Sequence, residues 1–171
     1  MGIEEVTVII GKIAAGFEEN CAKTLQEKQG VVLASILEQL KAGQDGKGEA
    51  LEPNYDNDPF FKEEGFWHNR GADYKAWKRT IPVPNFMPEL ALPMRPDHIP
   101  NLFIDGTFYG DINAKSLSDG LEIDPGTGHG PDIVSKWGQQ ILTLGPIAVA
   151  HFNEAHMLPS IDRFFQDCGY R

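Results

Sequence analysis

Apolar side chains recur every three or four residues along the first forty positions of the chain. This spacing places them on one face of a helix, and the same register continues as far as Leu40. The pattern therefore predicts one long N-terminal helix over residues 1–42, with a kink at Gly30. The predicted apolar face consists of Val6, Ile10, Ile13, Phe17, Cys21, Leu25, Val32, Ile36 and Leu40.

Two glycines, Gly11 and Gly16, lie inside this predicted helix. An interior glycine costs about 1 kcal/mol relative to alanine, so local preference stabilises the segment poorly. We expect packing against a partner to supply the missing stability. The N-terminal helix is thus a first indication of an interface that is built from helices.

The stretch 43–100 opens with closely spaced glycines and then carries prolines at short intervals, which prevent a continuous helix or a central strand. Its pattern predicts a long irregular arm with one short helix over 72–80. The arm carries more aromatic side chains than disordered segments do. Two interpretations stay open, because the arm could fold over its own core or lie on a neighbouring subunit. The candidate interface residues are Phe60, Phe61, Phe66, Trp67, Phe86 and Met87.

After Pro100 the pattern predicts shorter elements. Two alternating runs, 112–117 and 121–124, flank Ser118-Asp119-Gly120, and an Asp-Gly pair between strand-like runs indicates a β-hairpin. A short helix is predicted over 131–137, with a proline in its first turn.

A second long helix is predicted at the C-terminal end, with Pro159 as the residue that kinks or splits it. Residues 1–171 are therefore predicted to form a single α+β domain. In it, long N-terminal and C-terminal helices pack on a small antiparallel sheet, and a long Pro-rich irregular arm joins them.

Composition narrows the classes of partner. The chain has 171 residues, of which 41% are hydrophobic, and a net charge of -10. An acidic chain without a basic cluster repels nucleic acid and anionic lipid, so neither is an expected partner. The apolar run Val6–Ile10 is far too short to span a membrane, and synthesis in the cytoplasm is expected. The distant Cys21 and Cys168 fall within apolar helical patterns, so no disulfide is expected.

The motifs that carry chemistry are incomplete. His151 and His156 are five residues apart, which turns them away from each other on a helix and argues against a metal site. The glycine-rich stretch 126–130 lacks the Lys-Ser or Lys-Thr pair of a phosphate-binding loop. No nucleophile stands in a tight glycine-flanked turn. The sequence therefore predicts no catalytic residue, no metal ligand and no cofactor.

Two stretches of the sequence resemble phage proteins. Leu40–Glu49, followed by Pro53-Asn54-Tyr55 and Gly71–Trp77, resembles structural proteins of Bacteroidetes phages and prophages. Asn101–Ile112, the hairpin, Lys136-Trp137-Gly138 and the last helix are similar in order to the head-tail joining (neck) and tail-completion proteins of tailed phages. The arm from Pro82 to Pro100 has no counterpart there.

The resemblance implies a structural component of a phage or prophage particle, of the neck, head-tail connector or tail-completion type. Identical copies of such proteins form a ring, so the expected partners are other copies of the chain and neighbouring portal, adaptor or tail proteins. The expected location is the virion, assembled in the cytoplasm of the host bacterium.

Two alternatives stay open. One is a small phage-encoded hydrolase that degrades cell walls with the loop carboxylates Asp56, Asp58, Glu63 and Glu64. The other is a domain that binds or inhibits a host protein.

Overall fold

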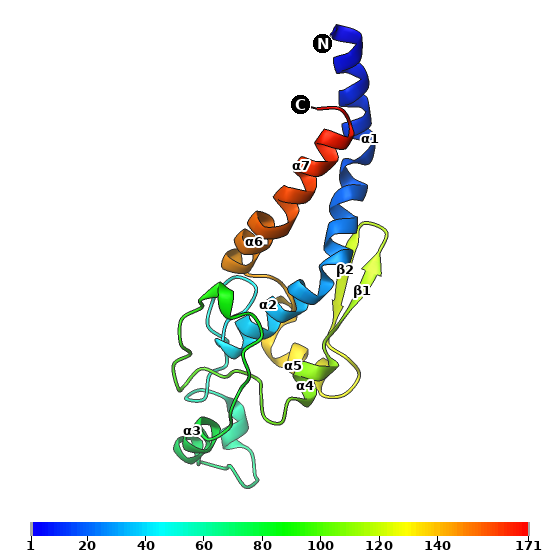
Figure 1. The fold of residues 1–171 in the computed structure, drawn as a ribbon. Helices are drawn as coiled ribbons and strands as arrows, with labels where there is room; N and C mark the ends of the chain where they lie inside the picture. Colours follow the sequence, from blue (N-terminus) through cyan, green and yellow to red (C-terminus); the bar gives the residue numbers. More distant parts are fainter. Residues whose placement is uncertain (1, 171) are drawn as a thin grey trace.

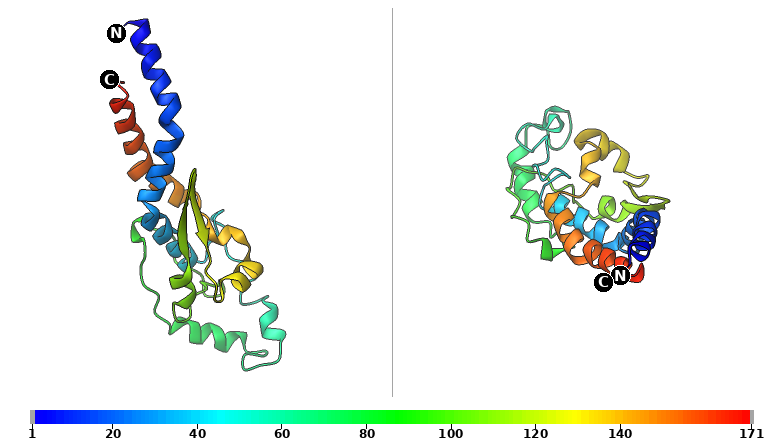
Figure 2. Two further views of the ribbon diagram at one scale, coloured as in Figure 1. Left: turned by 90° about the vertical axis from the view of Figure 1, so that its right-hand side faces the viewer. Right: turned by 90° about the horizontal axis from the view of Figure 1, so that it is seen from above.

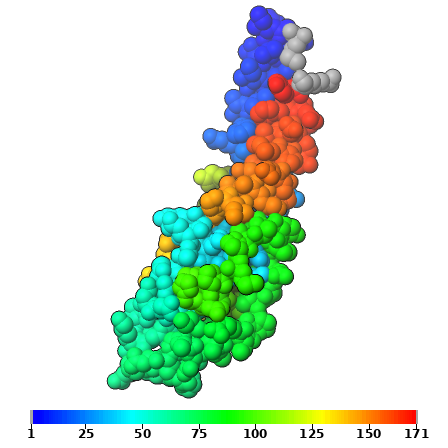
Figure 3. Space-filling view, turned by 90° about the vertical axis from the view of Figure 1, so that its left-hand side faces the viewer, coloured from blue at the N-terminus to red at the C-terminus, as the bar shows by residue number. Residues whose placement is uncertain are grey.

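The computed structural model describes residues 2–170 and has an elongated shape with two parts (Figures 1 and 3). The part that we call the stalk consists of α1 (Ile3–Glu27), α6 (Pro146–Phe152), α7 (Leu158–Asp167) and the turn between α6 and α7. The remaining residues form the base. Both chain ends lie at the far end of the stalk (Figure 2).

The predicted N-terminal helix is divided at Lys28, two residues before the predicted kink. The α2 helix (Gln29–Lys41) starts directly after this residue, whose φ of -107° and ψ of 19° are not helical. The change of direction follows from burial. Residues of α2 lie in the core of the base, where Ile36 and Leu40 are fully buried, whereas α1 runs out along α7.

The predicted interruption near Pro159 is present as a π-helical turn, Asn153–Met157, between α6 and α7. Pro159 then lies in the first turn of α7. Proline has no backbone N–H and its ring collides with the carbonyl four residues earlier in a regular α-helix. A wider π turn before the proline relieves that collision, so the chain continues in nearly the same direction.

Helices α1 and α7 pack closely and run in opposite directions (Figure 2). A Cβ atom built on Gly16 would lie 3.0 Å from the ring of Phe164, so a larger residue here would require that ring to shift by a few tenths of an ångström. Lower in the stalk, the hydroxyl groups of Thr24 and Ser160 are 2.7 Å apart. Shape and hydrogen bonding both fix how α7 lies on α1.

The predicted hairpin is present as β1 (Asn113–Leu117) and β2 (Gly120–Asp124), paired antiparallel with Leu117 opposite Gly120. Its β2 strand packs against α1. The Gln26 side-chain amide donates to the Leu117 carbonyl oxygen over 2.6 Å. The long N-terminal and C-terminal helices and the small antiparallel sheet are present as predicted, but α1 is the long helix that packs on the sheet, whereas α7 packs on α1.

The core of the base is formed by α2, α4 (Thr107–Asp111), α5 (Gly130–Trp137), the short helical turn η3 (Gln139–Leu142) and residues of the arm. The sequence pattern did not indicate α4. Its residues Phe108 and Tyr109 are both buried, so packing holds this five-residue helix, whose glycine disfavours it. The buried cluster consists of Val32, Ile36, Leu40, Leu51, Ile99, Phe108, Tyr109, Ile112, Val134, Ile141, Leu142 and Phe152.

The arm, 43–100, folds over the base of its own chain. It contains the short helices η1 (Pro59–Lys62), α3 (Gly71–Arg79) and η2 (Pro88–Leu90). One anchor is the Glu38 carboxylate of α2, which accepts the amide hydrogens of Phe86 (2.7 Å) and Met87 (3.1 Å). Another is the Arg95 guanidinium, which donates to main-chain carbonyl oxygens of the arm itself.

Between residues 2 and 170 the protein has no helix that is both long enough and apolar enough to cross a lipid bilayer.

Candidate interaction surfaces

Four of the six predicted interface residues gather around α3. Phe60, Phe61, Phe66 and Trp67 surround Tyr74, either in direct ring contact or through one another. The Phe61 and Trp67 rings lie 5.2 and 5.1 Å from the Tyr74 ring, at interplanar angles of 67° and 89°. We call this cluster, with Tyr55 and Trp77, the aromatic lobe.

The members of the aromatic lobe differ in the fraction of each side chain that is exposed to solvent. Phe66 is 71% exposed, Phe60 is 41% exposed and Trp67 is half-buried, so these three side chains present surface to solvent. Phe61 is only 8% exposed. It is therefore a core residue of the lobe and offers no surface to a partner.

The other two predicted residues, Phe86 and Met87, lie away from the aromatic lobe. Both are half-buried. The Phe86 ring is 5.4 Å from the ring of buried Tyr109, and the backbone amides of both residues bind Glu38. Their surroundings show that they fasten the arm to α2 and α4 of the same chain.

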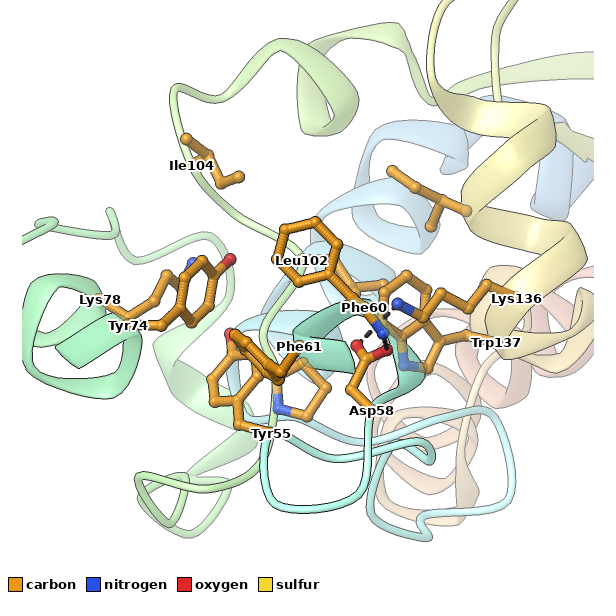
Figure 4. A pocket seen from close by; sticks show the side chains of 12 residues that line it. Tyr55, Asp58, Phe60, Phe61, Tyr74, Lys78, Leu102, Ile104, Lys136 and Trp137 are labelled. Atoms are coloured by element: carbon orange, nitrogen blue, oxygen red, sulfur yellow. Dashed lines mark hydrogen bonds and ion pairs between the residues drawn. The ribbon is translucent and has the colours of Figure 1, made fainter. Parts of the chain in front are cut away.

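A cavity of about 250 Å³ opens between the aromatic lobe and α5 (Figure 4). Its wall is mostly aromatic and aliphatic, with three charged side chains. The lining residues are Tyr55, Asp58, Phe60, Phe61, Tyr74, Lys78, Pro100, Leu102, Ile104, Ile133, Lys136 and Trp137.

The charged groups of this cavity are already engaged within the chain. Lys136 Nζ lies 2.6 Å from the Asp58 carboxylate, whose other oxygen accepts the Phe60 amide and begins η1. Lys78 is 3% exposed, and its Nζ donates to Asn101 Oδ1 over 2.8 Å. The same nitrogen donates to a main-chain carbonyl in the 101–104 segment. Burial, together with the nearby charge of Arg95, lowers the pKa of Lys78 to about 8.

The carboxylates proposed for a hydrolase do not share this cavity. Asp58 is the one acid that lines it. Asp56 is exposed and pairs with Lys75 over 2.6 Å, while Glu63 and Glu64 are exposed. Glycoside hydrolysis by two carboxylates needs both acids beside one substrate bond. The described cavity holds no such pair.

Among residues 2–170, no three His, Cys, Asp or Glu side chains lie close enough together to hold a metal ion. His151 and His156 stand on the α6–α7 segment, where His156 packs against the ring of Phe152 at 5.4 Å. Cys21 and Cys168 are free thiols.

The stalk carries the second surface, an apolar stripe along α1. Ile3 is 88% exposed and Ile10 is 61% exposed, and the stripe also includes partly exposed side chains between and below them. We define the α1 stripe as Ile3, Val6, Ile10, Ile13 and Phe17. These side chains are separated by three or four residues, so they follow one face of the helix.

The α7 helix widens this apolar surface. The ring of Phe165 lies 6.3 Å from that of Phe17 and 6.1 Å from that of Tyr170. Tyr170 is 59% exposed, and Leu158, at the other end of α7, is 56% exposed. The stripe is thus continuous with aromatic surface on the neighbouring helix of the same stalk.

The sequence pattern predicted the three- or four-residue spacing of this stripe, whereas the candidate interface residues were all chosen from the arm. Spacing alone cannot show which apolar positions are covered by the chain itself. On α1, contacts with α7 and the residue Gly169 after it cover Gly16 and Ile9, and the stripe lies beside them. The signal available in the sequence was the low helix propensity of α1, which indicated an interface built from helices.

Comparison with protein-family models, with curated proteins and with solved structures finds no match to this chain. The α1 stripe and the aromatic lobe are therefore the observations on which a function can be argued.

Proposed function

We propose that this protein is a structural subunit of a phage or prophage particle, of the neck, head-tail connector or tail-completion type. In this role it binds other copies of itself and neighbouring particle proteins, and shape rather than catalysis is its function. The observation that carries the proposal is the α1 stripe, an apolar surface left open on a projecting stalk.

The physical reason is the cost of leaving such a surface in water. Burying apolar surface contributes about 25 cal/mol per Å², so a stripe of isoleucines, a valine and a phenylalanine favours association. Contiguous apolar patches larger than a few hundred Å² are rare on soluble monomers and mark interaction sites. Identical copies that meet through matched surfaces form closed symmetric assemblies, as a ring in a phage particle requires.

The aromatic lobe supports the same role at the other end of the molecule. Phe66 and Phe60 are exposed there, and aromatic anchors are frequent among the residues that dominate binding energy. A particle subunit needs contacts with more than one neighbour. The exposed apolar residues of α1 and of the aromatic lobe meet that need, because α1 and α3 lie at opposite ends of the molecule (Figure 1).

The test is the oligomeric state of the purified chain. The double substitution Ile10→Glu with Phe17→Glu places two carboxylates in the α1 stripe, and burying an unpaired charge is strongly unfavourable. We expect light scattering after size-exclusion chromatography to show an oligomer for the natural sequence and a monomer for the variant. Circular dichroism checks that the variant keeps its helices.

Val8→Glu is the matched control, because Val8 is 57% exposed, close to the 61% of Ile10, and lies on another side of α1. It replaces an apolar side chain of similar exposure and adds one carboxylate, so it matches the Ile10→Glu half of the double variant. The control should stay oligomeric. A natural chain that is monomeric at high concentration, or a control that dissociates as readily as the double variant, would count against the proposal.

A further inference from the structure

We infer that the α1 stripe packs against the α1 stripe of a second copy of this chain, with the two helices parallel and in register. The inference rests on the proposed function, because it specifies the partner and the geometry of the stalk contact. Its basis is the seven-residue repeat of the stripe. Ile3, Ile10 and Phe17 are seven residues apart, and Val6 and Ile13 follow the first two by three residues.

These positions correspond to the a and d sites of a coiled-coil heptad. Isoleucine or valine fills both kinds of site from Ile3 to Ile13. β-branched side chains at both sites favour coiled coils of three or more helices over two. In the parallel, in-register arrangement that we infer, each layer contains the same residue from every copy, around an axis that runs along the stalk.

We call this row of a and d sites the seam. It ends where α7 of the same chain packs on α1. Asn20 and Thr24 occupy the next d and a sites, and both side chains bind Ser160 of α7, at 3.3 and 2.7 Å. Polar groups that are already bonded within the chain need no partner from outside. The open part of the seam thus spans Ile3 to Phe17, the part of α1 farthest from the base.

The flanks of the seam suit an identical partner. On one side the positions beside the open seam are Thr7 and Ala14, which are exposed and uncharged. On the other side Ile9 and Gly16 are covered by Gly169 and Phe164 of the same chain. The charged residues of this part of α1 lie around the opposite side of the helix: Glu4, Glu5, Lys12, Glu18 and Glu19.

The lack of charged groups along the seam also argues against a partner that is recognised by opposite charge. Two copies of a chain with net charge -10 repel each other, and a seam lined with acidic groups would add like-charge contacts. An uncharged seam avoids this local cost. A partner selected by opposite charge would find no charged group to bind here, since coiled-coil partners are chosen largely through charges at the flanking positions.

A short seam can be sufficient for association because α1 is already held as a helix by contacts within its own chain. A coiled coil of little more than two heptads is marginal for free peptides, since ordering the helix consumes most of the gain. Here α1 is already packed on α7 and Gly169 of the same chain from Ile9 onward. Association therefore has to order only the part of the helix before Ile9, and more of the burial energy appears as affinity.

Disulfide cross-linking of the full chain tests the register. In a background with Cys21→Ala and Cys168→Ala, Val6→Cys places one thiol at a d site. Parallel, in-register helices bring the introduced thiols of two chains together, within the short range that a disulfide requires. We expect mild oxidation to link Val6→Cys chains about tenfold faster than chains with Val8→Cys, because assembly raises the local thiol concentration.

The outcomes separate this inference from the proposed function. An antiparallel seam would place a sites opposite d sites and would instead link Val6→Cys chains to Ile10→Cys chains in a mixture, in preference to themselves. That result, or equal rates for Val6→Cys and Val8→Cys in a sample that light scattering shows to be oligomeric, overturns the inference and leaves the proposed function standing. Monomers throughout would overturn both.

Discussion

At the scale of single residues, Lys78 shows how a loop-rich arm is held in one conformation. Its ammonium group is buried and donates to Asn101 and to a carbonyl of the 101–104 segment, so α3 is bound to the start of the next segment. No carboxylate forms an ion pair with it among the described residues. Desolvation without a countercharge lowers its pKa to about 8.

This lowered pKa predicts a pH dependence of stability. The unfolded chain keeps the lysine protonated up to its ordinary pKa of 10.5, while the folded chain releases the proton near 8. The unfolded state therefore binds more protons in between, and the free energy of unfolding rises with pH. We expect a rise of about 1 kcal/mol between pH 8 and 9.5, measured by urea denaturation, relative to Lys78→Met.

The two proteins are compared by how steeply the free energy of unfolding changes with pH, because Lys78→Met also removes two hydrogen bonds and lowers stability at every pH. The buried tyrosines have raised pKa values, so their effect on stability appears above pH 10 and falls outside this window. Equal slopes for the two proteins would show that the ammonium group is not desolvated in solution.

At the scale of elements, the contact between α1 and α7 depends on one glycine. Gly16→Leu would place a side chain where the ring of Phe164 lies, 3.0 Å from the new Cβ. Leucine is a good helix former, so any loss reflects packing and not propensity. We expect the free energy of unfolding to fall by about 2 kcal/mol, in the range of overpacked cores.

Gly11→Leu is the matched substitution, since a Cβ at Gly11 meets no atom within 4 Å. Replacing this exposed glycine should raise helix stability by roughly 0.5 to 1 kcal/mol. Thermal denaturation of the two variants in the dissociated Ile10→Glu, Phe17→Glu background keeps assembly from masking the result. If both substitutions stabilise, α7 does not pack on α1 as described.

Much of this architecture follows from local patterns. The hairpin turn, the short α3 helix and the interruption near Pro159 depend on the chemistry of a few neighbouring residues, and the sequence predicted them. The break at Lys28 and the α4 helix depend on what lies opposite in the folded chain. Gly30 gave a local reason to expect a kink. The break lies at Lys28 instead, because α2 enters the base and buries Ile36 there.

Which of the candidate interface residues are exposed could not be predicted from the sequence, for the same reason. Aromatic content marked the arm as important, but burial decides which rings can reach a partner. Phe61 and Phe66 are close in sequence and alike in chemistry, and only Phe66 presents its ring to solvent. On α1, the contact with α7 separates the covered positions from the α1 stripe, and no local pattern contains that contact.

At the scale of the whole molecule, the stalk makes the chain elongated (Figures 1 and 2). A compact protein of this length has a radius of gyration of about 16 Å. We expect small-angle X-ray scattering of the monomeric Ile10→Glu, Phe17→Glu variant to give a clearly larger value, with a long tail in the distance distribution. A value near that of a sphere would mean that the stalk folds against the base.

The position of the chain ends determines where foreign sequence can be attached. Both chain ends lie at the far end of the stalk, with Gly169 packed on Ile9, so a tag fused at either end would stand beside the α1 stripe. The exposed hairpin corner at Ser118-Asp119 lies well away from that end of the stalk, beside the C-terminal end of α1. An epitope inserted at this corner would label the protein while leaving the tip of its N-terminal helix unencumbered.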